Sequence, residues 1–101
     1  KDIVLAAQST ATVVILMGMG KLNEIVEIYK SLEKKEVSIA IIQNGTTNEE
    51  KVGFGKIKNI LQVVEEKQLS SPAIIVIGEV VQKRVALSSL IQDIKIKSIA
   101  V

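Results

Sequence analysis

The fold is decided by VVILMG at residues 13–18, together with IAIIQNG at 39–45 and AIIVIG at 73–78. Each run is aliphatic, rich in β-branched residues and without polar alternation, as in a strand buried on both faces of a helix-covered sheet. The glycine at each end lets the backbone approach a ligand closely, because no Cβ intervenes. Ligands of open α/β sheets lie beyond the carboxyl ends of strands, so the three ends predict one floor of a binding crevice.

The sequence between the first two runs has helical periodicity over residues 21–35, with a charged opposite face. A strand at Thr12–Met17, this helix and a strand at Val37–Ile42 predict a β-α-β unit with parallel strands and a right-handed crossover. Residues 52–57 alternate large side chains with glycine, which predicts a strand with one bare face, antiparallel and near an edge.

The remaining segments complete one domain over residues 1–101. A helix follows Asn59, a plausible N-cap, and the Ser-Ser-Pro sequence at 70–72 ends it before the third run. Helical spacing resumes at Val80, whereas residues 94–97 alternate like an edge strand or a tail, and residues 2–8 resemble the end of a helix. The predicted class is α/β, with a mixed, mostly parallel sheet flanked by helices.

Composition excludes several functions. The chain has 13 basic and 11 acidic residues, 2% aromatic residues, and no cysteine or histidine. This argues against nucleic-acid binding, disulfides, the usual zinc sites and serine–histidine catalysis. The longest apolar stretch, residues 11–19, is about half of what a transmembrane helix needs. With no signal-peptide pattern and no initial methionine, we expect a cytoplasmic piece of a longer polypeptide.

Two glycine motifs have weak functional signals. Gly18-Met19-Gly20 lacks the third glycine of a dinucleotide fingerprint, since Asn23 stands there, and no acidic residue ends the second strand. An ordinary turn is the better interpretation. The sequence at 44–47, Asn-Gly-Thr-Thr, predicts a plain turn or a contact to a heterocycle or ribose. Glu79 is interpreted as a helix-start carboxylate without a catalytic role.

The order of the segments is more informative than any one of them. TVVILMG at 12–18, IAIIQNGTT at 39–47, VGFGKI at 52–57 and SPAIIVIGEVV at 71–81 resemble the carboxy-terminal half of the tetrapyrrole methyltransferases. Within that family the chain is most similar to the members that act on uroporphyrinogen III, over about residues 2–85. The resemblance implies the carboxy-terminal domain of the tetrapyrrole methylase fold.

The resemblance also implies a function. Such enzymes use S-adenosylmethionine to methylate two ring carbons of uroporphyrinogen III, which gives precorrin-2 for siroheme and cobalamin synthesis. They have two α/β domains, are usually homodimers and hold the cofactor between the domains. Carried over, Met17 and Gly45 match cofactor-contacting positions, and Asn44, Thr46 and Ala40 are weaker candidates for the adenosine pocket. No catalytic or metal-binding residue is expected in this chain.

Departures from the family pattern leave alternatives open. Gln43 replaces the usual glutamate before Asn44-Gly45-Thr46, and the amino-terminal half, with its glycine-rich loop, is absent. We therefore expect the chain alone to be inactive, because methyl transfer needs donor, acceptor carbon and proton acceptor held together. The alternatives are another member of the superfamily, such as a precorrin methyltransferase or diphthine synthase, and a non-catalytic oligomerising half domain with a bare apolar surface.

Overall fold

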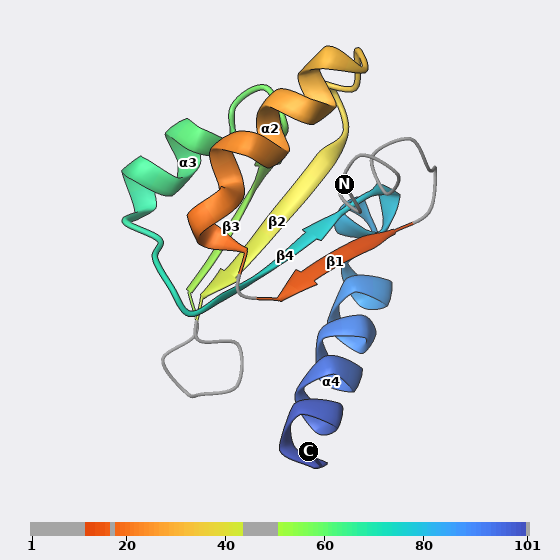
Figure 1. Cartoon of the computed structure of the whole chain (residues 1–101). Helices are drawn as coiled ribbons and strands as arrows, with labels where there is room; N and C mark the ends of the chain where they lie inside the picture. The colour runs from red at the N-terminus through yellow and green to blue at the C-terminus, as the bar shows by residue number, and fades with distance from the viewer. Residues whose placement is uncertain (1–11, 17, 44–50, 101) are drawn as a thin grey trace.

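A computed structural model describes residues 12–16, 18–43 and 51–100. One sheet separates two helices on one side from a long helix on the other (Figure 1). The elements are β1 (Val13–Leu16), η1 (Met19–Lys21), α2 (Leu22–Ser31), β2 (Ser38–Gln43), β3 (Lys51–Lys56), α3 (Ile60–Lys67), β4 (Ala73–Ile77), η2 (Glu79–Gln82) and α4 (Arg84–Ala100).

The sheet has the order β1-β4-β2-β3, and each of its described pairs is antiparallel. The predicted mostly parallel sheet is therefore wrong. β1 and β2 do run in the same direction, but β4 lies between them and runs the opposite way. The aliphatic runs contain no information on direction, because the side chains of a strand buried on both faces have the same pattern in either direction.

Burial differs among the three aliphatic strands. β2 and β4 are covered on both faces, as predicted. β1 is an edge strand whose residues alternate, with Val14 36% and Leu16 57% exposed. The prediction of a third strand covered on both faces is wrong, because β1 lies at the edge of the sheet and its face with Val14 and Leu16 is left partly exposed.

The three glycine-bearing strand ends do not meet. Leu16 pairs with Ile74 and Gln43 with Ala73, so β1 and β2 finish where β4 starts. We call this the Gln43 end of the sheet. Gly78 follows β4 at the opposite end, beside the first residue of β2; we call that the Ser38 end. The single crevice floor is therefore wrong, because the antiparallel β4 carries its glycine away from the other two.

α2 and α3 cover one face of the sheet (Figure 1). α3 packs closely on β3 because Gly53 and Gly55 present no side chain: a Cβ at Gly53 would lie 3.1 Å from Val63 Cγ1 of α3. β3 is an antiparallel edge strand with a bare face, as predicted. The buried core on this side consists of Leu22, Ile25, Val26, Tyr29, Ile39, Ile41, Ile57, Ile60, Leu69, Ala73, Ile75 and Ile77.

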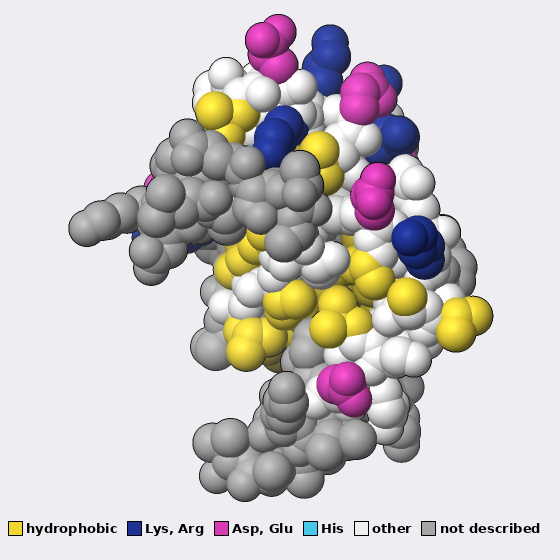
Figure 2. Space-filling model, turned by 90° about the vertical axis from the view of Figure 1, so that its right-hand side faces the viewer, with side chains coloured by type: hydrophobic (Ala, Val, Ile, Leu, Met, Phe, Trp, Pro, Cys, Tyr) yellow, Lys and Arg dark blue, Asp and Glu magenta, His cyan; other side chains and the backbone are white. Residues whose placement is uncertain are grey.

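The opposite face of the sheet is covered only in part, by η2 and the start of α4, and we call it the open face. Its smaller buried cluster consists of Ala40, Ile42, Ile74, Val76, Val81 and Leu87. Val14, Leu16 and Phe54 share this face with them by strand register and stay partly exposed, and Val85 at the start of α4 is 84% exposed. Figure 2 shows apolar side chains gathered on the side of the molecule that carries β1 and α4.

Three local predictions have different outcomes. Residues 94–97 belong to α4, so the predicted strand or tail is wrong. Asn59 is at the N-cap position of α3, but its Oδ1 accepts a hydrogen bond from Lys56 N at 2.8 Å instead of capping the helix. The predicted helix end at 2–8 lies outside the described residues.

Among the described helices, none has the length and apolar character of a membrane span.

Candidate functional site

The Gln43 end is where the predicted cofactor residues leave the sheet. Leu16 and Gln43 lie on the two sides of the first residues of β4, two strand spacings apart. Neighbouring strands are about 4.8 Å apart, so the chain leaves β1 and β2 at points separated by about 10 Å. One nucleoside-sized ligand can contact both.

Gly18 shapes the turn after β1. It is buried, and a Cβ there would lie 2.5 Å from Ile15 Cγ2 and 3.1 Å from Ile75 Cδ1. Its carbonyl accepts a hydrogen bond from Lys21 N at 3.0 Å, which starts η1. Glycine here serves close backbone packing, and Leu16 beside it offers a half-exposed apolar surface.

Polar side chains tie the Gln43 end together. Gln43 Oε1 accepts a hydrogen bond from Ser70 N at 2.8 Å. Lys51 Nζ donates to the carbonyl of Lys67 at 3.4 Å. Gln43, which replaces the expected glutamate, makes this hydrogen bond with a side-chain oxygen that a glutamate would also provide. This supports the expectation that the loss of charge leaves the backbone geometry intact.

Of the five predicted cofactor residues, the structure describes one. Met17, Asn44, Gly45 and Thr46 lie outside the described residues, next to Leu16, Gly18 and Gln43. Ala40 is fully buried in β2, paired with Phe54 and Val76. It lies three residues, about 10 Å, from the Gln43 end, and its side chain has no exposed surface. Contact of a ligand with any of the five stays a prediction.

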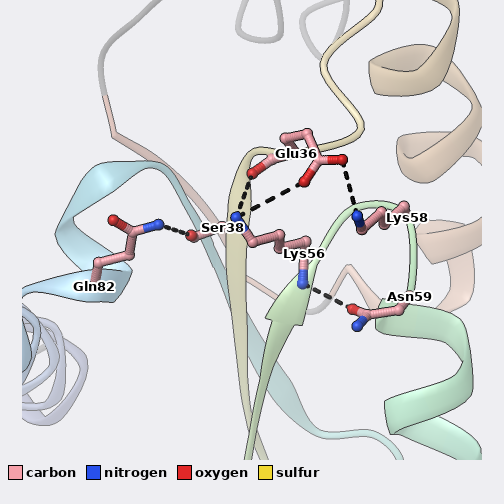
Figure 3. Close-up of polar contacts among 6 residues, drawn as sticks. All are labelled: Glu36, Ser38, Lys56, Lys58, Asn59 and Gln82. Carbon is pink, nitrogen blue, oxygen red and sulfur yellow. Dashed lines mark hydrogen bonds and ion pairs between the residues drawn. The ribbon is translucent and has the colours of Figure 1, made fainter.

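A polar cluster at the Ser38 end was missed by sequence reasoning (Figure 3). Lys58 Nζ lies 2.9 Å from Glu36 Oε2, and Lys56 Nζ lies 3.8 Å from Glu36 Oε1. Gln82 Nε2 donates to Ser38 Oγ at 2.7 Å. These residues come from separate segments, so no motif in the sequence could have indicated the cluster.

Two shallow hollows open at the Ser38 end and share Ser38 and Gln82. The first, about 350 Å³, is lined mostly by charged residues that include Glu33, Glu36 and Glu79. The second, about 430 Å³, is lined by Phe54, Gly55, Lys56, Lys58, Asn59 and Val81 besides the shared pair.

The ion pairs beside these hollows are exposed to water. The hydrogen bond from Lys58 holds the pKa of the Glu36 carboxyl below its ordinary value, although the carboxyl is exposed. Exposed ion pairs stabilise a fold little. We therefore interpret this cluster as local structure of the turn between β3 and α3. Glu79 is exposed at the start of η2, as predicted. Within the described parts of the chain, no group of three or more acidic side chains is arranged to hold a metal ion.

Known proteins related to this chain were found by sequence. The chain is 36% identical over 76 residues to an S-adenosyl-L-methionine-dependent uroporphyrinogen III methyltransferase of Methanosarcina barkeri, covering 74% of this chain and 30% of that protein. It is 40% identical over 76 residues to uroporphyrinogen-III C-methyltransferase of Bacillus subtilis, covering 74% and 16%. The chain thus spans a third or less of these two relatives. No family model matches it.

Solved structures agree with these matches. Uroporphyrin-III C-methyltransferase of Thermus thermophilus in complex with S-adenosyl homocysteine matches at a TM-score of 0.65 and 25% identity, over 81% of this chain and 36% of that one. A cobalt precorrin-4 methyltransferase matches at a TM-score of 0.71 but 11% identity, which supports the fold alone.

Fold and sequence together define the class: the chain is homologous to part of the tetrapyrrole methyltransferases. Within that class, its relatives are named uroporphyrinogen-III C-methyltransferase or siroheme synthase. The resemblance stated from the sequence is thereby confirmed.

Proposed function

We propose that this chain is the cofactor-side, carboxy-terminal half of an enzyme that transfers methyl groups from S-adenosylmethionine to uroporphyrinogen III, giving precorrin-2. The sequence matches to enzymes of that name support the reaction and the substrate. The likeness to a structure in complex with S-adenosyl homocysteine supports the cofactor.

The observation that carries the proposal is the common end of β1 and β2. Two strands that run in the same direction finish on either side of Ala73 and Ile74, so Leu16 and Gln43, which precede residues 17 and 44–46, lie at one end of the sheet with β4 between them. We propose that Met17 and Gly45 contact the cofactor and that Asn44 and Thr46 lie beside its adenosine. The exposed apolar surface of Leu16 at this end fits a flat heterocycle.

The described residues fit binding better than catalysis. When bound, the cofactor supplies an electrophilic methyl group on a sulfonium. The Gln43 end offers backbone, an aliphatic side chain and a glutamine, and none of the described residues there is placed as a proton acceptor. We therefore propose that this half binds and orients the cofactor while the other half supplies acid–base groups, and that the chain alone is inactive.

The open face supports a partner for this half. Val14, Leu16 and Phe54 leave apolar surface uncovered, and Val85 adds to it from α4. Val14 and Leu16 lie on one edge strand of the sheet and Phe54 on the other. Exposed apolar side chains of this kind are typical of an interface. We propose that the missing amino-terminal half and a second copy of the enzyme cover it in a homodimer.

A titration with S-adenosyl homocysteine tests the proposal. The chain is titrated alone and with the amino-terminal part of the Methanosarcina relative added in trans, and uroporphyrinogen III turnover is followed in parallel. We expect binding that strengthens with the added part, and turnover only in its presence. Turnover by the chain alone would refute its assignment as an incomplete half.

A second candidate is a non-catalytic oligomerising half domain, and the exposed apolar residues of the open face favour it. It predicts self-association without cofactor binding in either titration. Another superfamily member, such as a precorrin methyltransferase or diphthine synthase, predicts cofactor binding with a different substrate. The likeness to cobalt precorrin-4 methyltransferase supports only the fold, so it does not favour that alternative.

A further inference from the structure

The second hollow at the Ser38 end lies between the edge strand β3 and η2. Lys56 pairs with Ser38 across the β2–β3 ladder, and Phe54, two residues earlier in β3, lies on the same face of the sheet. Val81 and Gln82 border the hollow from η2. Residues from three separate elements therefore surround one space of about 430 Å³ on the open face.

One part of this hollow is apolar. Phe54 is 38% exposed, and Val81 is held in the buried cluster of the open face. Gly55 adds backbone to the lining without a side chain. An apolar group placed here would be favoured, because it and the exposed surface of the phenylalanine both lose contact with water.

The other part of the hollow is cationic. Lys56 and Lys58 line it, and their ammonium groups share one carboxylate: Lys58 Nζ lies 2.9 Å from Glu36 Oε2, and Lys56 Nζ lies 3.8 Å from Glu36 Oε1 (Figure 3). Glu36 lines the first hollow, and no acidic residue that the structure describes lines the second. Two ammonium groups and one carboxylate leave an excess of positive charge beside the second hollow.

The same residues have hydrogen-bond donors to spare. An ammonium group carries three donors, and the hydrogen bond from Lys58 to Glu36 uses one of them. Asn59, which also lines the hollow, accepts a hydrogen bond from Lys56 N through its Oδ1 at 2.8 Å. This bond orients the amide, and no residue that the structure describes accepts a hydrogen bond from its Nδ2. An anion would supply the acceptors.

We propose that the second hollow binds a small organic carboxylate, with the apolar body of the ligand against Phe54 and Val81 and its carboxylate on Lys56 and Lys58. An apolar wall beside cationic groups favours such a ligand over an inorganic anion. The pairs with Glu36 do not prevent binding, because exposed ion pairs contribute little and their exchange for a ligand carboxylate costs little.

This site is separate from the proposed cofactor site and does not depend on it. It lies at the Ser38 end, whereas the proposed cofactor site lies at the Gln43 end. S-adenosyl homocysteine carries an ammonium group next to its carboxylate, and Lys56 and Lys58 would repel that group. We therefore expect the cofactor to leave the second hollow empty.

Benzoate is the probe, because it joins a carboxylate to a flat apolar ring. The labelled 101-residue chain is titrated by NMR, at constant ionic strength, with benzoate, with acetate, which lacks the ring, and with benzylamine, which is a cation at neutral pH. We expect saturable shift changes at Phe54, Gly55 and Lys58, with a dissociation constant for benzoate on the order of 1 mM and roughly tenfold weaker binding of acetate. Equal affinities for benzoate and acetate, or saturation by benzylamine, would overturn the proposal.

Two variants at exposed positions test the cationic part. Lys58→Met removes one ammonium group, and we expect it to raise the dissociation constant of benzoate roughly fivefold. Lys51→Met is the matched control, since Lys51 is a lysine of β3 at the Gln43 end, and we expect it to change nothing. Thermal unfolding of both variants is measured first, and we expect similar midpoints.

Glu36→Gln gives a change in the opposite direction. It removes the carboxylate that competes for both ammonium groups, so we expect the dissociation constant of benzoate to fall roughly threefold. Equal weakening in Lys58→Met and Lys51→Met would show a general attraction of anions to the chain and would overturn the site. Absence of saturable benzoate binding by the unaltered chain would overturn it as well.

Discussion

Gln82 Nε2 donates a hydrogen bond to Ser38 Oγ at 2.7 Å and so joins η2 to the start of β2 across 44 residues of sequence. Ser38 is the one polar residue that is buried among those the structure describes. η2 also carries Val81 into the core of the open face. The bond therefore fixes the segment that begins to cover that face.

We predict that Ser38→Ala lowers the free energy of unfolding by about 1 kcal/mol, because one partly buried hydrogen bond is lost. Gln82→Ala has a similar or smaller cost, since its amide is exposed. Urea unfolding of both single variants and the double variant measures the coupling. Costs that add fully in the double variant contradict a direct contribution from the pair.

The glycines of β3 give a second prediction. A Cβ at Gly55 would lie 2.7 Å from Asn59 Oδ1 and 3.3 Å from Val63 Cγ2. Gly55→Ala disturbs the Asn59 hydrogen bond and pushes α3 away, so we expect a loss of about 1–3 kcal/mol in the free energy of unfolding.

Gly20→Ala is the matched control, because a Cβ there meets nothing within 4 Å. We expect this substitution to leave the free energy of unfolding unchanged or to raise it by about 0.4–1 kcal/mol, because alanine lowers the conformational entropy of the unfolded chain. Equal effects of the two substitutions would show that α3 does not depend on the bare face of β3.

The open face gives a third prediction. Leu16, 57% exposed on β1, and Leu61, 37% exposed on α3, are both surface leucines, but only Leu16 belongs to the open face. We expect Leu16→Ser to weaken self-association of the isolated chain, measured by sedimentation, while Leu61→Ser does not. The same weakening in both variants would indicate general hydrophobic aggregation.

Glu36 gives a prediction about pH. Its pKa lies below the ordinary value of 4.5, chiefly because of the hydrogen bond from Lys58, so the ionised carboxyl favours the folded state. This contribution is fully present above the ordinary pKa and is lost as the pH falls through the lowered one.

An NMR titration of the Glu36 side chain measures its pKa directly. We expect Lys58→Met to bring the pKa back toward its ordinary value and Lys56→Met to change it less, since the Lys56 ammonium lies 3.8 Å away without that hydrogen bond. A larger change in Lys56→Met would show that Lys56, and not Lys58, is the main cause of the low pKa of Glu36.

The sequence predicted the elements better than their arrangement. The aliphatic runs predicted β2 and β4, and alternation with glycine predicted β3 as an antiparallel edge strand. The direction of β4 and its place between β1 and β2 could not be predicted, because an apolar run is compatible with either direction. The edge position of β1 followed from that order, and so did the separation of Gly78 from the other two glycines.

The candidate site shows the same division. The family pattern placed Met17 and Asn44-Gly45-Thr46 at strand ends, and the structure brings the ends of β1 and β2 together. The contacts that hold this end, Gln43 with Ser70 and Lys51 with Lys67, join residues with no shared motif. Such contacts depend on tertiary packing, so periodicity and local spacing could not have indicated them.

The most direct test of the central claim is an NMR titration of the labelled chain with S-adenosyl homocysteine, with the unlabelled amino-terminal part of a relative present. We expect saturable shift changes, beyond those caused by that part alone, at Leu16, Gly18 and Gln43, and none at Ser38 or Gln82. Saturable changes centred on the Ser38 end, or none at any concentration while the relative's own intact enzyme binds, would contradict a cofactor site where β1 and β2 end.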